Sequence, residues 1–166
     1  MGRDALTFKA GNFDYVVGSG ILLADGTADG GFRGGWYLDG RTAFRRSFLA
    51  TLKSGPLKLD GFYLQLEGRS SDLRVHGYGG DFEYNFTDAG LATGLLYLKV
   101  PDQVVDKEIF WQGHDSLALR ADWSATGNLS FRGEYVYQSR PGAHPRGWFL
   151  EGAYWWTKKH WSPRVS

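Results

Sequence analysis

Charged side chains occupy every second position in several segments of this 166-residue chain. Successive side chains of a β-strand point to opposite faces, so this spacing would place the charges together on one polar face. Such a face either lines an aqueous lumen, where it selects solutes by charge and size, or forms cross-strand ion pairs. Both roles are compatible. The residues expected there are Lys9, Arg45, Asp81, Glu83, Lys99, Arg120, Asp122, Arg132, Glu134 and Glu151.

Two arginines of this set could form an anion site. Arg120 and Arg132 fall on neighbouring segments joined by a tight turn. Guanidinium groups bind carboxylate or sulfate in a bidentate manner, so the pair could hold an oxyanion. Alternatively, Asp122 and Glu134 neutralise the two arginines, and both interpretations stay open from the sequence.

Other kinds of chemistry find little support. The four histidines are scattered near loops and turns, and no His or Cys spacing suggests a zinc site. Asp25, Asp29 and Asp39 lie in a Gly-rich stretch that lacks the glutamate of a calcium loop. Neither a nucleophile elbow nor a phosphate-binding loop occurs. We therefore expect no catalytic residues, no metal and no cofactor, and no enzyme activity.

The charged positions must be held by strands, and eight strand-like segments can be placed. The links between these segments alternate strictly between tight and long. In an up-and-down meander, all tight turns then gather at one end of the sheet, which is typical of a transmembrane β-barrel. The first long link, 16–40, is long enough to fold into a pore and narrow it. The predicted strands are 6–15, 41–53, 57–67, 73–86, 91–100, 116–124, 129–138 and 148–157.

Each segment pairs a polar face with an apolar one. In a soluble barrel, such as a lipocalin-like carrier, the apolar face would point inward; in a membrane barrel it would meet lipid. Aromatic residues crowd near the strand ends, as in the two interfacial girdles of a membrane barrel. We therefore expect an outward, exposed apolar face, tested best by the following rows: Leu96 and Leu98, Leu117 and Leu119, and Leu129 and Phe131.

Composition is compatible with this interpretation. The chain has 24 Gly, 7 Trp, 9 Tyr and 11 Phe, a combination that favours β-structure over helix. It has no run of 18 apolar residues, whereas a barrel strand needs only about 9–11 alternating residues. A net charge of +1 gives no drive toward nucleic acid. No signal-peptide pattern precedes the first strand, so we expect a processed protein or a piece of a larger barrel.

Several motifs resemble those of a known family. Residues 8–13 and 18–22 are similar to the early strand of alginate-export-type outer-membrane porins. Residues 45–48, Arg-Arg-Ser-Phe, resemble the element that follows, and residues 55–63 resemble its next hairpin. Residues 148–154 and 161–166 are similar to a later strand and turn.

The resemblance implies a barrel of about 18 strands, of which eight would be present here. It also implies carbohydrate or anionic solutes. Asn12 and Ile21 stand where the family pattern has arginines, so two groups that could bind a polyanion are missing.

The sequence thus predicts a single all-β domain, 1–166, an antiparallel up-and-down meander forming a transmembrane β-barrel or part of a larger one. The expected function is a porin-type channel of the bacterial outer membrane for small hydrophilic solutes, including anionic saccharides or other carbohydrates. Its expected partners are the lipid bilayer and these solutes, without nucleic acid. The alternative is a complete eight-stranded barrel that acts as a binding, adhesion or structural module without conduction, because eight strands leave little interior space.

Overall fold

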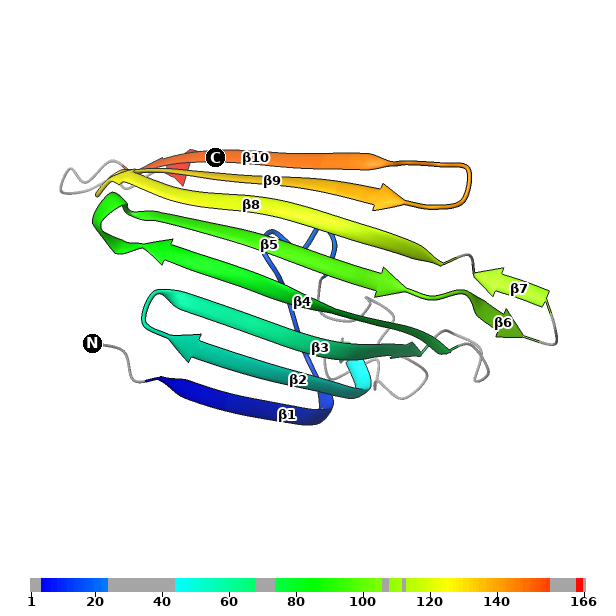
Figure 1. Ribbon diagram of the computed structural model, residues 1–166. Helices are drawn as coiled ribbons and strands as arrows, with labels where there is room; N and C mark the ends of the chain where they lie inside the picture. Colours follow the sequence, from blue (N-terminus) through cyan, green and yellow to red (C-terminus); the bar gives the residue numbers. More distant parts are fainter. Residues whose placement is uncertain are drawn as a thin grey trace, which may run out of the picture.

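A computed structural model describes residues 4–23, 44–67, 74–105, 108–111, 113–155 and 164–165. These residues form one antiparallel nine-stranded sheet and a separate two-stranded hairpin (Figure 1). Each strand of the large sheet pairs with the next one along the chain, so the sheet is an up-and-down meander. Its strands are β1 (Ala5–Phe13), β2 (Phe44–Ser54), β3 (Leu57–Glu67), β4 (Arg74–Phe86), β5 (Leu91–Val100), β8 (His114–Thr126), β9 (Leu129–Ser139), β10 (Arg146–Trp155) and β11 (Arg164–Val165).

The all-β antiparallel fold and all eight strands are therefore confirmed, with shifted ends. The predicted long link after β5 contains the small hairpin of β6 (Gln103–Val105) and β7 (Glu108–Trp111). These two strands are too short for an alternating pattern to stand out in the sequence. A 3₁₀ turn, η1 (Thr87–Ala89), joins β4 to β5 and ends at Gly90, whose φ of 60° is left-handed.

Tight and long links separate to opposite ends of the sheet, as predicted. The β2–β3, β4–β5 and β8–β9 turns lie together at one end, which we call the turn end (Figure 1). The β9–β10 link and the β6–β7 hairpin lie at the other end, which we call the loop end. Gly55 permits the tight β2–β3 turn because its φ of 54° is disfavoured for residues with a side chain.

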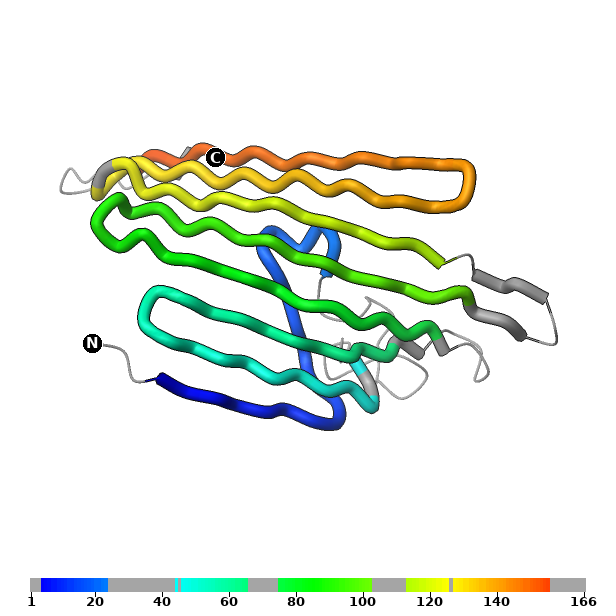
Figure 2. The backbone as a smooth tube through the Cα atoms, in the orientation of Figure 1, coloured from blue at the N-terminus to red at the C-terminus, as the bar shows by residue number. Residues whose placement is uncertain are grey.

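Segment 14–23 leaves β1 at the loop end and crosses one face of the sheet (Figure 2). We call this face the inner face and the opposite one the outer face. Tyr15, Val17 and Leu23 of the segment are buried in an apolar cluster with side chains of the sheet. The other members of this cluster are Phe44, Leu49, Phe62, Leu64, Leu96, Leu98, Val100, Ala118 and Val136.

The segment explains where the predicted orientation fails. Leu117, Leu119 and Phe131 are exposed on the outer face, as expected, whereas Leu129 lies on the same face but is half-buried. Leu96 and Leu98 are instead buried on the inner face, and the outward residues of β5 are Leu95 and Tyr97. The prediction was wrong for β5 because apolar residues occupy both of its faces. Leu96 and Leu98 pack beneath segment 14–23, and Leu95 and Tyr97 form part of the outer surface.

Strand β3 shows the same reversal. Alternation along the sequence predicts that Phe62 and Leu64 face outward, although Lys58 and Asp60 share their phase near the segment end. All four share the inner face, where Phe62 and Leu64 are buried and the Phe62 ring packs on Tyr15 at 5.4 Å. In β2, Arg46 shares the sequence phase of the outward residue Phe48. The β1–β2 register is irregular beside Arg46, which has a φ of 47°.

The sheet is open within the described residues. Strand β1 pairs only with β2, and the described part of the chain contains no ladder from β1 to β10. Such a ladder would be needed for an eight-stranded closed barrel. Within the same residues, no helix is long and apolar enough to cross a bilayer.

Candidate functional site

The inner face carries a cluster of charged residues around segment 14–23, built from β3, β4, β8 and β9. Its centre is a buried ion pair. Arg120 donates through Nη1 and Nη2 to the two carboxylate oxygens of Asp81, at 2.6 and 2.7 Å. Both side chains are almost fully buried, and Nη2 also lies 3.5 Å from Glu83 Oε2. A bidentate pair of this kind fixes the guanidinium in one orientation.

Arg120 lies on β8, whereas Asp81 lies two strands away on β4, with β5 between them. The intervening position of β5 is Gly94, which pairs in register with Arg120. A Cβ atom at Gly94 would lie 2.3 Å from Cζ of Arg120. The absence of a side chain at Gly94 therefore lets the guanidinium cross β5.

A second contact ties segment 14–23 to β3. The Tyr15 hydroxyl donates to Asp60 Oδ2 at 2.9 Å, and Lys58 Nζ lies 3.1 Å from the same oxygen. Asp60 is only 2% exposed. Burial, together with the neighbouring Asp60 carboxylate, raises the pKa of Tyr15 far above its ordinary value. Tyr15 therefore stays protonated and remains a hydrogen-bond donor.

A third contact ties the segment to β9, on the far side of the cluster. The Ser19 backbone N–H and hydroxyl both donate to Glu134 Oε2, at 2.8 and 2.5 Å. Gly18, with a φ of 62°, lies so close that a Cβ atom there would be 2.6 Å from Glu134 Oε2. Segment 14–23 is thus anchored at Asp60 on β3 and at Glu134 on β9, so it spans the inner face between them.

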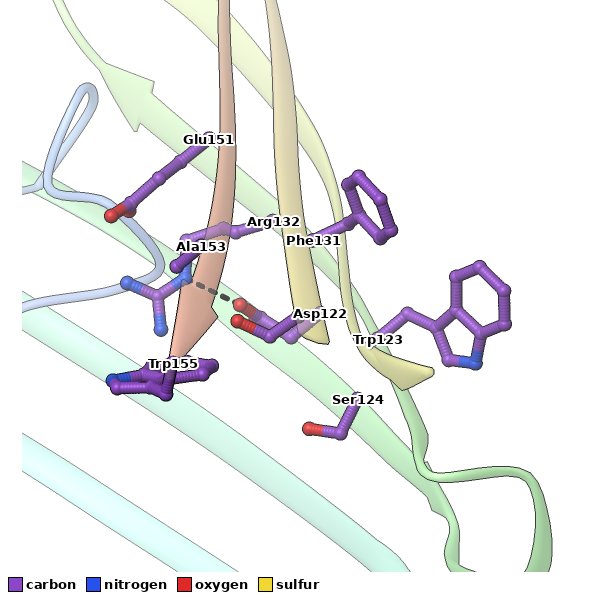
Figure 3. A pocket seen from close by; sticks show the side chains of 9 residues that line it. Asp122, Trp123, Ser124, Phe131, Arg132, Glu151, Ala153 and Trp155 are labelled. Carbon is purple, nitrogen blue, oxygen red and sulfur yellow. Dashed lines mark hydrogen bonds and ion pairs between the residues drawn. The ribbon is translucent and has the colours of Figure 1, made fainter. Parts of the chain in front are cut away.

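A separate polar group lies nearer the turn end, on β8, β9 and β10. Asp122 accepts a charge-assisted hydrogen bond from Arg132 Nε, and Glu151 pairs in register with Arg132 on the same face. Figure 3 shows these side chains on the side of the sheet opposite Phe131 and Trp123. With Trp155 and Ala153 they border a pocket of about 320 Å³.

The sheet places the predicted polar residues as follows. Seven of them share the inner face: Asp81, Glu83, Arg120, Asp122, Arg132, Glu134 and Glu151. Lys9 belongs to this face as well, because it pairs in register with the buried Leu49. The side chain of Arg45 lies outside the described residues.

Lys99 was assigned to the wrong face. It shares the outer face with Tyr97 and lies 3.9 Å from Asp115, which also accepts a hydrogen bond from the Tyr97 hydroxyl. The error follows from the reversed orientation of β5. At the loop end, a lysine on the outer face can keep its ammonium group in water.

The side chains of Arg120 and Arg132 do not point toward a common anion site. Arg120 is engaged by Asp81, and Arg132 by Asp122. Neutralising carboxylates are therefore present, as in the ion-pair interpretation, although the partner of Arg120 is Asp81 rather than Asp122 or Glu134.

Sequence reasoning missed four members of the cluster: Tyr15, Ser19, Lys58 and Asp60. Lys58 and Asp60 did carry a signal, because they broke the expected outward pattern of β3. The motif Gly18-Ser19-Gly20 matches neither a phosphate loop nor a nucleophile elbow, and its resemblance to the early strand of alginate-export-type porins gave no indication of a contact with Glu134. Its two glycines both have positive φ, which allows the tight bend that presents Ser19 to Glu134.

In the described part of the chain, no three His, Cys, Asp or Glu residues gather in a way that could hold a metal ion. The three aspartates of the first long link, Asp25, Asp29 and Asp39, lie outside the described residues. Comparison with known proteins finds no matching family model, no matching curated protein and no matching solved structure.

The gap at Gly94 leads to a first prediction. Gly94→Ala should push the Arg120 guanidinium away from Asp81 and lower the free energy of unfolding by about 1–3 kcal/mol, the usual cost of overpacking. Gly61→Ala is the matched control, because a Cβ atom there would meet nothing within 4 Å. Urea titration in detergent micelles, followed by tryptophan fluorescence, would measure the free energy of unfolding of both variants. An equal effect of the two substitutions would contradict the crossing role of Gly94.

Proposed function

We propose that this chain forms part of the wall of a β-barrel channel in a bacterial outer membrane. The observation that carries the proposal is the contrast between the two faces of one sheet. The outer face is a nearly continuous apolar surface, larger than soluble monomers usually expose. Its exposed residues are Leu6, Phe8, Phe48, Leu52, Leu59, Tyr63, Tyr78, Phe82, Phe86, Leu95, Tyr97, Leu117, Leu119, Trp123, Phe131, Tyr135, Trp148, Leu150 and Tyr154.

The inner face suits an aqueous lumen. Its charges occur as both signs within short distances, as in the pairs of Arg120 with Asp81 and Arg132 with Asp122. Segment 14–23 lies across this face and would narrow the path for a solute. A narrow path lined by fixed charges of both signs favours small hydrophilic solutes and gives weak selection by net charge.

The motif resemblance to alginate-export-type porins supports the same class of function, including saccharides among the solutes. The departures at Asn12 and Ile21, and the pairing of Arg120 and Arg132 with carboxylates, weaken any preference for a polyanion. Neutral carbohydrates and other small hydrophilic solutes are therefore the better candidates.

The experiment is reconstitution into planar lipid bilayers of the intact barrel that contains this chain. We expect discrete conductance steps in KCl with only modest anion or cation preference, because the lumen charges are mutually paired. Stable insertion into lipid without conductance would favour the alternative, a binding, adhesion or structural module.

The orientation of the sheet in lipid gives a second prediction. Trp148 is 77% exposed on the outer face, whereas Trp155 lies on the inner face. In liposomes made with brominated lipids, which quench tryptophan on contact, Trp148→Phe should remove a quenched component of the fluorescence. Trp155→Phe is the control and should leave that component in place. The opposite pattern would place the inner face against lipid and contradict the proposed orientation.

A further inference from the structure

The pocket at the turn end has the composition of a small-molecule site. It lies on the inner face where β8, β9 and β10 approach their turn-end residues (Figure 3). Its volume of about 320 Å³ lies at the lower end of the range for small-ligand pockets, roughly 300–1,000 Å³. Such a volume suits a single ring rather than an extended chain.

The lining combines one aromatic ring with a short polar row. Trp155 and Ala153 supply an apolar floor, while Asp122, Arg132 and Glu151 supply charged groups beside it. An indole presents a broad flat surface at a low entropic cost, and carboxylates and guanidinium groups orient hydroxyls through directional hydrogen bonds. A pyranose ring has the matching pattern, because one face exposes C–H groups while its edge carries hydroxyls.

The Arg132–Asp122 pair of the polar row is accessible to a ligand. Arg132 and Asp122 are 50% and 40% exposed, in contrast to the buried pair of Arg120 and Asp81. Exposed ion pairs contribute little to stability, about 0–1 kcal/mol. Replacing part of the Arg132–Asp122 contact with hydrogen bonds to ligand hydroxyls would therefore cost little stability. The buried Arg120–Asp81 pair, in contrast, stabilises the fold and is not accessible to a ligand.

We infer that this pocket is a binding site for a neutral saccharide, with one sugar ring on Trp155 and its hydroxyls on Asp122, Arg132 and Glu151. The inference rests on the proposed function, because it requires the inner face to meet an aqueous lumen. The pocket contains two carboxylates and one guanidinium, an excess of negative charge that disfavours uronic acids. The inference therefore identifies neutral sugars as the solutes that bind to this wall while they pass through the channel.

The test measures saccharide binding to the full chain in detergent micelles by isothermal titration calorimetry, independently of any conductance. The probes are maltose, methyl β-glucoside and glucuronate. We expect maltose and methyl β-glucoside to bind more tightly than glucuronate. Trp155→Ala should weaken the binding of both neutral sugars about tenfold or more, a loss equivalent to about 1.4 kcal/mol. Trp148→Ala is the matched control on the outer face and should leave binding unchanged.

A second variant guards against misfolding as the cause. Asp122→Asn keeps the size of the side chain and removes its charge. It should weaken the binding of neutral sugars, by a factor several-fold smaller than Trp155→Ala does, and it should strengthen the binding of glucuronate. Binding that is absent in the wild type, insensitive to Trp155→Ala, or stronger for glucuronate would overturn the inference. A conducting channel without saccharide binding would leave the proposed function intact. Saccharide binding without conductance would refute the proposed function while retaining the site.

Discussion

Arg120→Met should lower the free energy of unfolding by about 3–5 kcal/mol, the usual cost of removing one partner of a buried ion pair. The substitution would leave the Asp81 carboxylate, which is 1% exposed, without its bidentate partner. The remaining charge would have to be hydrated or protonated inside the sheet. Urea titration of the chain in detergent micelles, followed by tryptophan fluorescence, would measure the change.

Two controls make this result specific. Arg132→Met removes a half-exposed partner on the same face and should cost about 1 kcal/mol or less. The double variant Arg120→Met/Asp81→Leu removes both buried charges and should recover much of the stability. If Arg120→Met and Arg132→Met cost the same, the Arg120 pair would have to be far more hydrated than its burial indicates.

Tyr15→Phe/Ser19→Ala should release segment 14–23 from the inner face and widen the proposed channel. The two substitutions remove the hydroxyl hydrogen bonds to Asp60 and Glu134. Hydrogen bonds to charged groups contribute about 1.5–3 kcal/mol each, so the segment should be undocked in a far larger fraction of molecules. Single-channel recordings should show a larger main conductance or frequent transitions to a larger state.

The matched control for this variant is Tyr63→Phe, which removes a hydroxyl from the outer face. It should leave the conductance unchanged. An unchanged conductance in the double variant, together with the same protection of the segment from proteolysis, would show that the apolar contacts of Tyr15 and Val17 hold the segment without these hydrogen bonds.

Alternating polarity and turn chemistry were enough to place the eight long strands and the two ends of the sheet. The face on which each side chain lies could be predicted from the alternation where one face was clearly polar, as in β8 and β9. The prediction failed in β3 and β5, because a strand with apolar residues on both faces has no preferred side until its packing partner is known. That partner is segment 14–23, which is distant along the chain from most of what it covers.

The site was predictable to a similar degree. The inner-face positions of Arg120 and Glu134 followed from the alternation of β8 and β9. The pairing of Arg120 with Asp81 did not, because it crosses an intervening strand and depends on the register that brings Gly94 beside Arg120. The contact between Ser19 and Glu134 joins residues 115 positions apart, a separation that local patterns do not encode.

This separation also sets the order in which the molecule can form. Neighbouring strands of the meander are close in the chain, so each hairpin closes a short loop at a small entropic cost. The docking of Ser19 must wait until β9, the carrier of Glu134, has joined the growing sheet. We therefore expect slow kinetics for the protection of segment 14–23, with the hairpins formed first and the interior closed last.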